Sequence, residues 1–198
     1  NGEYVILGRE RHVAFARSGG LPYPSRAIRT KNYLYIRNFE PDRWPIGDPA
    51  GFENTESDPE DMDDMLIAAS EWGERRKYRN AFADIDTGPT KHWILANRNA
   101  VDVRPKFDLA FGKRPSEELY DLRVDPYYMR NIAGDPSYSE TRNTLSAKLL
   151  EILENHNDPR LTDVDCRFEE SPFAGPVAAE WYEIPHNDVI NKTIPIPY

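Results

Sequence analysis

The fold class is decided by one stretch, Ala27-Ile28-Arg29-Thr30-Lys31-Asn32-Tyr33-Leu34-Tyr35-Ile36-Arg37. On each side of residues 31–32, apolar and polar side chains alternate with a period of two, which is the pattern of half-buried strands. Two such runs separated by two turn-forming residues indicate a β-hairpin. The alternation predicts that Ile28, Leu34 and Ile36 face the interior of the protein.

Strands outside the hairpin are predicted at two places. Residues 4–7, Tyr-Val-Ile-Leu, are rich in β-branched and aromatic side chains, and residues 118–122, Glu-Leu-Tyr-Asp-Leu, form a second short run. The polar residues 8–12 follow the first run and are expected to form a turn. Together with the hairpin, these runs predict strands at four places in the chain.

The clearest helix is predicted over residues 136–155. Asp135 is suited to the N-cap and Pro136 to the first helical position. Four apolar residues then recur at helical spacing and form one stripe, which consists of Leu145, Leu149, Ile152 and Leu153. We expect this stripe to pack on the hairpin. Further helices are predicted over residues 61–78 and 91–98.

The composition indicates many loops and argues against a long helical bundle. The chain has 198 residues, of which 39% are hydrophobic, and its 17 prolines exceed ordinary usage. Residues 161–198 are rich in proline and follow neither a helical nor a strand period, so we expect an extended tail. The longest apolar run, residues 65–69, is far shorter than the roughly 20 residues that cross a bilayer.

Charge and cysteine content exclude several classes of function. The net charge of −9 argues against a general nucleic-acid binder. The single cysteine, Cys166, excludes an intrachain disulfide and a cysteine-based zinc cluster. The four histidines lack the His-Glu-x-x-His spacing of a zinc site, and the acidic run at 53–64 lacks EF-hand spacing. The sequence therefore predicts no metal site in this chain.

One basic segment, Arg9-Glu10-Arg11-His12, follows the first predicted strand. A guanidinium group fits tetrahedral oxyanions with two parallel donors, and histidine either donates or accepts a hydrogen bond. Arg9, Arg11 and His12 are therefore candidate ligand-binding residues, with Glu10 orienting one of the arginines. The alternative is that an arginine of this segment simply pairs with Glu10 on the surface.

Six stretches follow one another in an informative order. They are Gly8-Arg9-Glu10-Arg11-His12, residues 21–39, Pro41-Asp42-Arg43-Trp44-Pro45, Asp84-Ile85-Asp86-Thr87-Gly88-Pro89-Thr90-Lys91, residues 111–122, and Asn157-Asp158-Pro159-Arg160. In this order they resemble the C-terminal part of formylglycine-dependent sulfatases, and most closely the bacterial branch related to N-sulfoglucosamine sulfohydrolase (heparan N-sulfatase). The resemblance covers residues 4–160, with an acidic insertion at 53–83, and leaves the tail at 161–198 unmatched.

This resemblance implies both a fold and a reaction. Such sulfatases have a large α/β domain like that of alkaline phosphatase, followed by a small C-terminal subdomain in which one helix packs on a short antiparallel sheet. The resemblance implies that this chain is that subdomain and has an α+β fold. In the family, hydrated formylglycine attacks sulfur beside a calcium ion held by carboxylates, and both groups belong to the N-terminal part.

The resemblance also implies partners and a setting for the chain. The expected partners are a sulfated carbohydrate, such as heparan sulfate or another glycosaminoglycan, and the N-terminal catalytic domain of the same enzyme. The reaction would remove a sulfate ester or an N-sulfate group. Family analogy places such enzymes in the periplasm, outside the cell or in lysosomes, and neither nucleic acid nor a membrane is an expected partner.

The chain itself is expected to lack the catalytic groups. Tyr23-Pro24-Ser25-Arg26 resembles the end of the C-x-P-S-R signature, but Pro22 stands where an oxidisable Cys or Ser is required. No catalytic residue, metal ligand or cofactor is therefore assigned to this chain, which is expected to be inactive alone and to supply Arg9, Arg11 and His12 to the substrate pocket. Two alternatives stay open: a phosphonate or phosphate ester hydrolase of the same superfamily, and a non-catalytic module that binds sugar sulfates.

Overall fold

A computed structural model of the chain describes residues 2–13, 16–49, 81–86 and 88–169. The chain divides into two compact units that alternate along the sequence. Unit 1 consists of Asn1–Glu10, Tyr23–Arg43 and Lys113–Phe168, and unit 2 of Arg11–Pro22, Trp44–Gly112 and Glu169–Tyr198. The helix predicted at 61–78, most of the acidic insertion and the tail beyond residue 169 lie outside the described residues.

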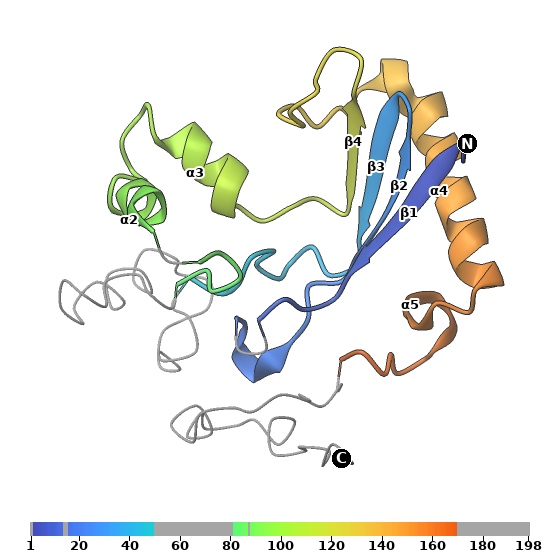
Figure 1. Cartoon of the computed structure of the whole chain (residues 1–198), viewed down its shortest axis with the longest axis horizontal. Helices are drawn as coiled ribbons and strands as arrows, with labels where there is room; N and C mark the ends of the chain where they lie inside the picture. Colours follow the sequence, from blue (N-terminus) through green and yellow to red (C-terminus); the bar gives the residue numbers. More distant parts are fainter. Residues whose placement is uncertain (1, 14–15, 50–80, 87, 170–198) are drawn as a thin grey trace. The chain divides into compact units, whose positions relative to one another are not determined.

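Unit 1 is built on a four-stranded antiparallel sheet (Figure 1). Its strands follow one another in space as in sequence, in the order β1 (Tyr4–Arg9), β2 (Ser25–Thr30), β3 (Tyr33–Asn38) and β4 (Glu117–Asp121). These strands confirm the predicted hairpin and the two predicted outer strands. The expected turn over residues 8–12 was wrong at its start, because Gly8 and Arg9 continue the pairing of β1 with Arg26 and Ser25 of β2.

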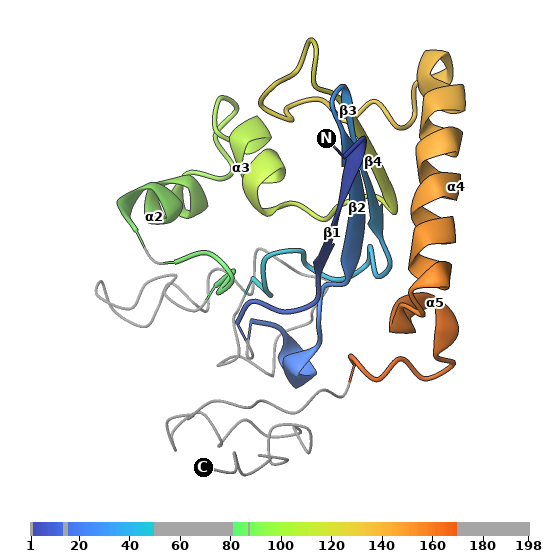
Figure 2. The same cartoon turned by 45° about the vertical axis from the view of Figure 1, so that its right-hand side comes forward.

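One face of this sheet is covered by the long helix α4 (Ser139–Asn155), which runs beside it (Figure 2). A short 3-10 turn (Pro136–Tyr138) precedes α4, and the Asp135 carboxylate caps this turn by accepting the Ser137 N–H at 2.9 Å. The predicted helix over 136–155 is therefore confirmed, with its first three residues in the tighter 3-10 form. Sheet and helix together confirm the α+β prediction.

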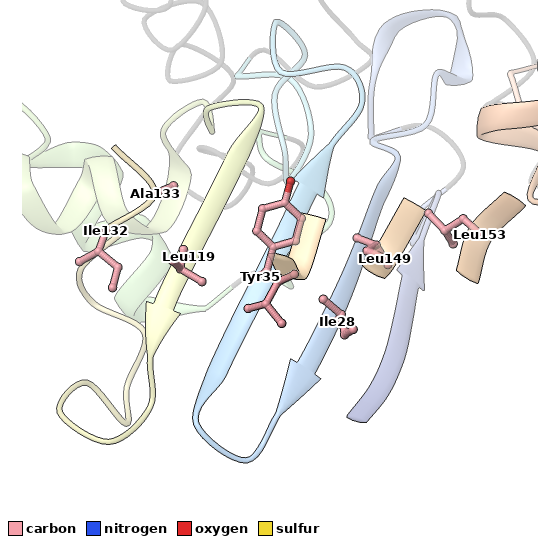
Figure 3. Packing of buried hydrophobic residues seen from close by; sticks show 8 residues of the cluster. Ile28, Tyr35, Leu119, Ile132, Ala133, Leu149 and Leu153 are labelled. Atoms are coloured by element: carbon pink, nitrogen blue, oxygen red, sulfur yellow. The ribbon is translucent and has the colours of Figure 1, made fainter. Parts of the chain in front are cut away.

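The register of the hairpin decides which side chains face α4. The two-residue turn pairs Ile28 with Tyr35, and both are fully buried on the face toward the helix (Figure 3). The prediction that Leu34 and Ile36 share a face with Ile28 was wrong. Across a two-residue turn an even-numbered residue pairs with an odd-numbered one, so Leu34 and Ile36 lie on the opposite face.

The core of unit 1 lies between the sheet and α4 (Figure 3). The predicted stripe is confirmed, since Leu145, Leu149 and Leu153 are buried and Ile152 packs against them at the margin. The remaining buried members of this core are Ile28, Tyr35, Leu119, Ile132 and Ala133. Apolar burial of this kind is the main source of stability for a small unit.

Tyr35 brings a polar atom into this core and has partners for it there. Its hydroxyl donates to Glu117 Oε1 at 2.5 Å and lies 3.0 Å from Ser146 Oγ on α4. Burial, reinforced by the hydrogen bond to the Glu117 carboxylate, raises the pKa of Tyr35 to about 12. The hydroxyl therefore fixes the position of α4 along the sheet as well as filling space beneath it.

Unit 2 contains two short helices, α2 (Pro89–Ala96) and α3 (Arg104–Phe111). The helix predicted over 91–98 is confirmed as α2, which begins two residues earlier at a proline, a residue well suited to a first helical position. The sequence reasoning missed α3, although Phe107 and Phe111 lie four residues apart and are both buried. The core of unit 2 consists of Ala81, Phe82, Leu95, Phe107 and Phe111.

Replacing Leu149 by alanine tests the core of unit 1. Leu149 is fully buried beneath the sheet, so Leu149→Ala should lower the free energy of unfolding by about 2–5 kcal/mol. Thr144→Ala, at an exposed position of the same helix, is the control and should change it by less than about 0.5 kcal/mol. Urea unfolding of the whole chain measures both values, and equal losses for the two variants would contradict this packing.

Candidate functional site

The basic segment Arg9-Glu10-Arg11-His12 spans the boundary between the two units in the sequence. Arg9 ends β1 and Glu10 follows it in unit 1, whereas Arg11 and His12 begin a segment of unit 2. The three residues predicted to bind substrate are thus held by two different sets of neighbours, one in each unit.

In unit 1, Glu10 belongs to a group of four charged residues that we call the Glu10 cluster: Glu10, Arg26, Asp158 and Arg160. Arg26 Nη2 lies 2.8 Å from Glu10 Oε1, and Arg160 Nη2 lies 2.5 Å from Glu10 Oε2. Arg26 also donates to Asp158 in a two-pronged contact, with Nε at 2.7 Å and Nη2 at 3.1 Å from the two carboxylate oxygens.

The Glu10 cluster is internally balanced and largely shielded from solvent. Two guanidinium groups face two carboxylates, and the side chains of Arg26 and Arg160 are only 7% and 4% exposed. Burial alone would raise the pKa of Asp158, but hydrogen bonds from Arg26 and from the Arg160 backbone N–H hold it below its usual value. Each charge therefore depends on its partners, because an isolated buried charge is strongly unfavourable.

Local structure explains how these four residues meet. Arg26 lies on β2 opposite Gly8 of β1, and a Cβ atom at Gly8 would come within 3.2 Å of the Arg26 side chain. The glycine thus leaves room for the guanidinium group. Asp158 caps the short helix α5 (Pro159–Thr162) by accepting the Arg160 N–H at 2.9 Å, which places both residues beside the sheet.

The partners of Glu10 differ from the expected ones. Sequence reasoning paired Glu10 with an arginine of its own segment, either to orient it or as a surface ion pair. The carboxylate instead takes Arg26 and Arg160 as partners, and Arg9 contributes its backbone carbonyl to Arg26 Nη1 at 3.3 Å. The residues that organise this end of β1 therefore come from later motifs, and their spacing of up to 150 positions gave no local signal.

In unit 2, the side chain of Arg11 is held by backbone carbonyl groups. Its Nε donates to Gly20 O at 2.6 Å, and its Nη2 donates to Glu169 O at 2.8 Å. The contact with Gly20 fastens the start of the segment to the short 3-10 turn (Ser18–Gly20). Arg11 therefore acts as a positioning group for the residues that follow it.

His12 and Val13 are held by one acidic residue, Asp84. The Asp84 carbonyl oxygen lies 3.2 Å from His12 Nδ1, and its carboxylate accepts the Val13 N–H at 2.9 Å. The same carboxylate accepts a hydrogen bond from the buried Arg17 at 2.5 Å. The His12 side chain remains exposed, so its backbone is fixed while its ring is accessible.

Asp84 in turn is anchored to the segment around residue 46. Its backbone N–H donates to Ile46 O at 3.0 Å, and Arg17 donates to the carbonyl oxygens of Trp44 and Pro45 at 2.6 and 2.8 Å. Gly47 has φ +106°, and a Cβ atom there would lie 2.8 Å from the Ala16 carbonyl oxygen, so only glycine permits this approach.

Lys91 is a buried amine in the same unit. Its Nζ donates to Phe82 O at 3.0 Å and to Ile85 O at 2.8 Å, so it closes the loop that carries Asp84. Burial lowers the pKa of Lys91 from 10.5 to about 8, against an opposing effect of the Asp86 charge. Lys91 and Asp84 both come from the Asp-Ile-Asp-Thr-Gly-Pro-Thr-Lys stretch, although sequence reasoning assigned neither a role.

The exposed ring of His12, on a backbone that Asp84 holds in place, can exchange hydrogen bonds with a ligand. Within the described ranges, no group of three or more His, Cys, Asp or Glu side chains could hold a metal ion. Among the helices of the same ranges, none combines the length and the hydropathy of a membrane span. Comparison of the sequence with family models and with curated proteins finds no match.

Removing Arg26 tests the Glu10 cluster. Arg26→Ala leaves two half-buried carboxylates facing Arg160 alone and should lower the free energy of unfolding by about 3–5 kcal/mol. Arg29→Ala, at an exposed position on the other face of β2, is the matched control and should have little effect. Urea unfolding followed by circular dichroism measures both, and a loss below about 1 kcal/mol for Arg26→Ala would contradict the cluster's structural role.

The stability of the chain should depend on pH through Lys91. Between pH 8 and 10.5 the unfolded chain holds a proton that folded Lys91 has lost, so the free energy of unfolding should rise with pH in this window. Because each pKa unit corresponds to about 1.4 kcal/mol, the rise from pH 8 to 9.5 should be about 1–2 kcal/mol. Above pH 10, Tyr35 should lower the free energy of unfolding as the pH rises. Its pKa is raised in the folded chain, so tyrosine in the unfolded chain loses its proton first.

Urea unfolding at several pH values between 7.5 and 9.5 measures this dependence. Lys91→Met should flatten the slope, whereas Lys106→Met, at an exposed position on α3, should keep it. The same slope in the wild type and in Lys91→Met would show that another group titrates in this window.

Proposed function

We propose that this chain is the C-terminal region of a formylglycine-dependent sulfatase of the N-sulfoglucosamine sulfohydrolase-like branch. It serves an enzyme that removes sulfate ester or N-sulfate groups from a sulfated sugar of the glycosaminoglycan type, such as heparan sulfate. The nucleophile and the calcium ion belong to the N-terminal catalytic domain, which is the partner of this chain. The described residues offer no ligand set for the metal, so no chemical step is assigned to them.

The observation that carries the proposal is that side chains from separate stretches of the sequence contact one another. Glu10, Arg26 and the Asp158–Arg160 pair come from three of the stretches that resemble the sulfatases, and they form one buried cluster. His12 and Asp84 join two such stretches in unit 2. Stretches that match a family by chance have no reason to contact one another, so these contacts support a common origin for the matches.

The fold of unit 1 supports the same proposal. A short antiparallel sheet with one helix packed on it is what the resemblance implies for the C-terminal subdomain. On the face away from α4, Val5 and Leu7 of β1 are 58% and 48% exposed. We assign this apolar strip to contact with the N-terminal catalytic domain, because exposed apolar patches mark interaction surfaces.

The three residues proposed to bind the substrate have different contacts within the protein, and we propose a different role for each. Arg11 donates to two carbonyl groups and positions the segment. His12 is exposed at the end of that segment and is the principal contact for the substrate. Arg9, at the end of β1, remains a proposed contact for the sulfate group because guanidinium groups bind tetrahedral oxyanions well.

The proposal is tested on the complete gene product. The reading frame upstream of the Asn1 codon should encode a C-x-P-S-R signature, and the complete protein should hydrolyse glucosamine N-sulfate or a sulfated oligosaccharide. The isolated 198-residue chain should show no turnover, because covalent catalysis requires an activated nucleophile that it lacks. A complete protein that prefers phosphate or phosphonate esters would replace the proposal by the superfamily alternative. Binding of the sugar sulfate without the signature would replace it by the non-catalytic module.

A further inference from the structure

We infer that His12 recognises the sugar through Nε2 acting as a hydrogen-bond acceptor. It would then bind a donor group of the substrate, a hydroxyl or the N–H of an N-sulfate, and not the sulfate oxygens. This inference rests on the proposed function and specifies how one of its contacts works. It assigns His12 a role in substrate specificity, separate from the charge-based role expected of the arginines.

The protonation of the ring follows from its one hydrogen bond. His12 Nδ1 lies 3.2 Å from the carbonyl oxygen of Asp84, and a carbonyl oxygen can only accept. Nδ1 therefore carries the proton, and in the neutral ring Nε2 presents its lone pair. Within the part of the chain that the structure describes, Nε2 of His12 has no hydrogen-bond partner of its own.

The carbonyl that sets this tautomer is itself held in place. The Asp84 carboxylate accepts hydrogen bonds from the Val13 N–H and from Arg17, and the Asp84 N–H donates to Ile46 O. On the other side of His12, Arg11 is fastened to Gly20 O. The ring therefore projects from a segment that is fixed on both sides, which favours a defined orientation for Nε2.

This geometry selects a class of ligand atom. Sulfate oxygens only accept hydrogen bonds, so a neutral Nε2 gains nothing from them, whereas sugar hydroxyl groups and the sulfamate N–H donate. A protonated ring would reverse the preference and bind the sulfate. Among the residues that the structure describes, the acidic residue that contacts His12 is Asp84, and its carboxylate is already paired with Arg17.

The tautomer is measured directly on the 198-residue chain. With ¹⁵N-labelled histidine at pH 8.5, long-range ¹H–¹⁵N correlation spectra should show His12 with Nδ1 protonated and Nε2 bare. His156 is an internal reference, because its Nδ1 lies 2.8 Å from the Ile152 carbonyl oxygen and it should give the same signature. A His12 ring with Nε2 protonated would overturn the inference whatever the enzyme's activity.

Kinetics of the complete enzyme then test the role of Nε2. His12→Asn can still donate to the Asp84 carbonyl from the position of Nδ1, but it places no atom at Nε2. It should lower kcat/KM for glucosamine N-sulfate about 3- to 10-fold, mainly by raising KM, which is the loss expected for one hydrogen bond. His12→Gln carries an acceptor oxygen as far as Nε2 and should recover part of this loss.

The remaining outcomes separate the inference from the proposed function. His156→Asn, at the exposed end of α4, is the matched control and should keep the wild-type kcat/KM. If the complete enzyme is active and His12→Asn matches the wild type, the inference is wrong and the proposed function stands. If the wild-type enzyme turns over no sulfated sugar, the proposed function fails, and the substrate assigned to His12 fails with it.

Discussion

The carboxylate of Glu10 lies between two arginines, and the arrangement of unit 1 depends on this placement. Through Arg26 it is joined to the central hairpin, and through Arg160 to the residues that follow α4. The second carboxylate, Asp158, caps α5 and also accepts hydrogen bonds from Arg26, so two carboxylates balance two guanidinium groups. The hydrophobic core holds α4 against the sheet. The Glu10 cluster joins the end of β1 to the residues that follow α4.

The strands and helices of unit 1 were largely predictable from local patterns. The hairpin follows from its period-two alternation, and α4 follows from its leucine stripe, because both signals are contained in a few neighbouring residues. The faces of the hairpin were predictable too, but Leu34 and Ile36 were assigned by their hydrophobicity instead of by the two-residue turn. Helix α3 was missed because only Phe107 and Phe111 mark its buried face, amid charged neighbours.

The candidate site could be predicted only in part. The segment containing Arg9, Arg11 and His12 was identified by its residue types, but the partners of its side chains lie far away in the sequence. Glu10 meets Arg160 across 150 positions and His12 meets Asp84 across 72. Nothing in a single sequence indicates which of its many acidic and basic residues will pair at such separations. The contacts of Arg11 with Gly20 and Glu169 gave no signal for a related reason, since backbone carbonyl groups can be supplied by any residue.

The long separations within the Glu10 cluster also have a consequence for how the chain folds. Contacts between Arg26 and Asp158 close a segment of 132 positions, and the entropy of such a closure must be overcome before the ion pairs contribute any stability. The hairpin and α4 can form from neighbouring residues, whereas the cluster requires both to be in place already. We therefore expect the cluster to form last, after the rest of unit 1 has assembled. Its ion pairs then join the end of β1 to α5.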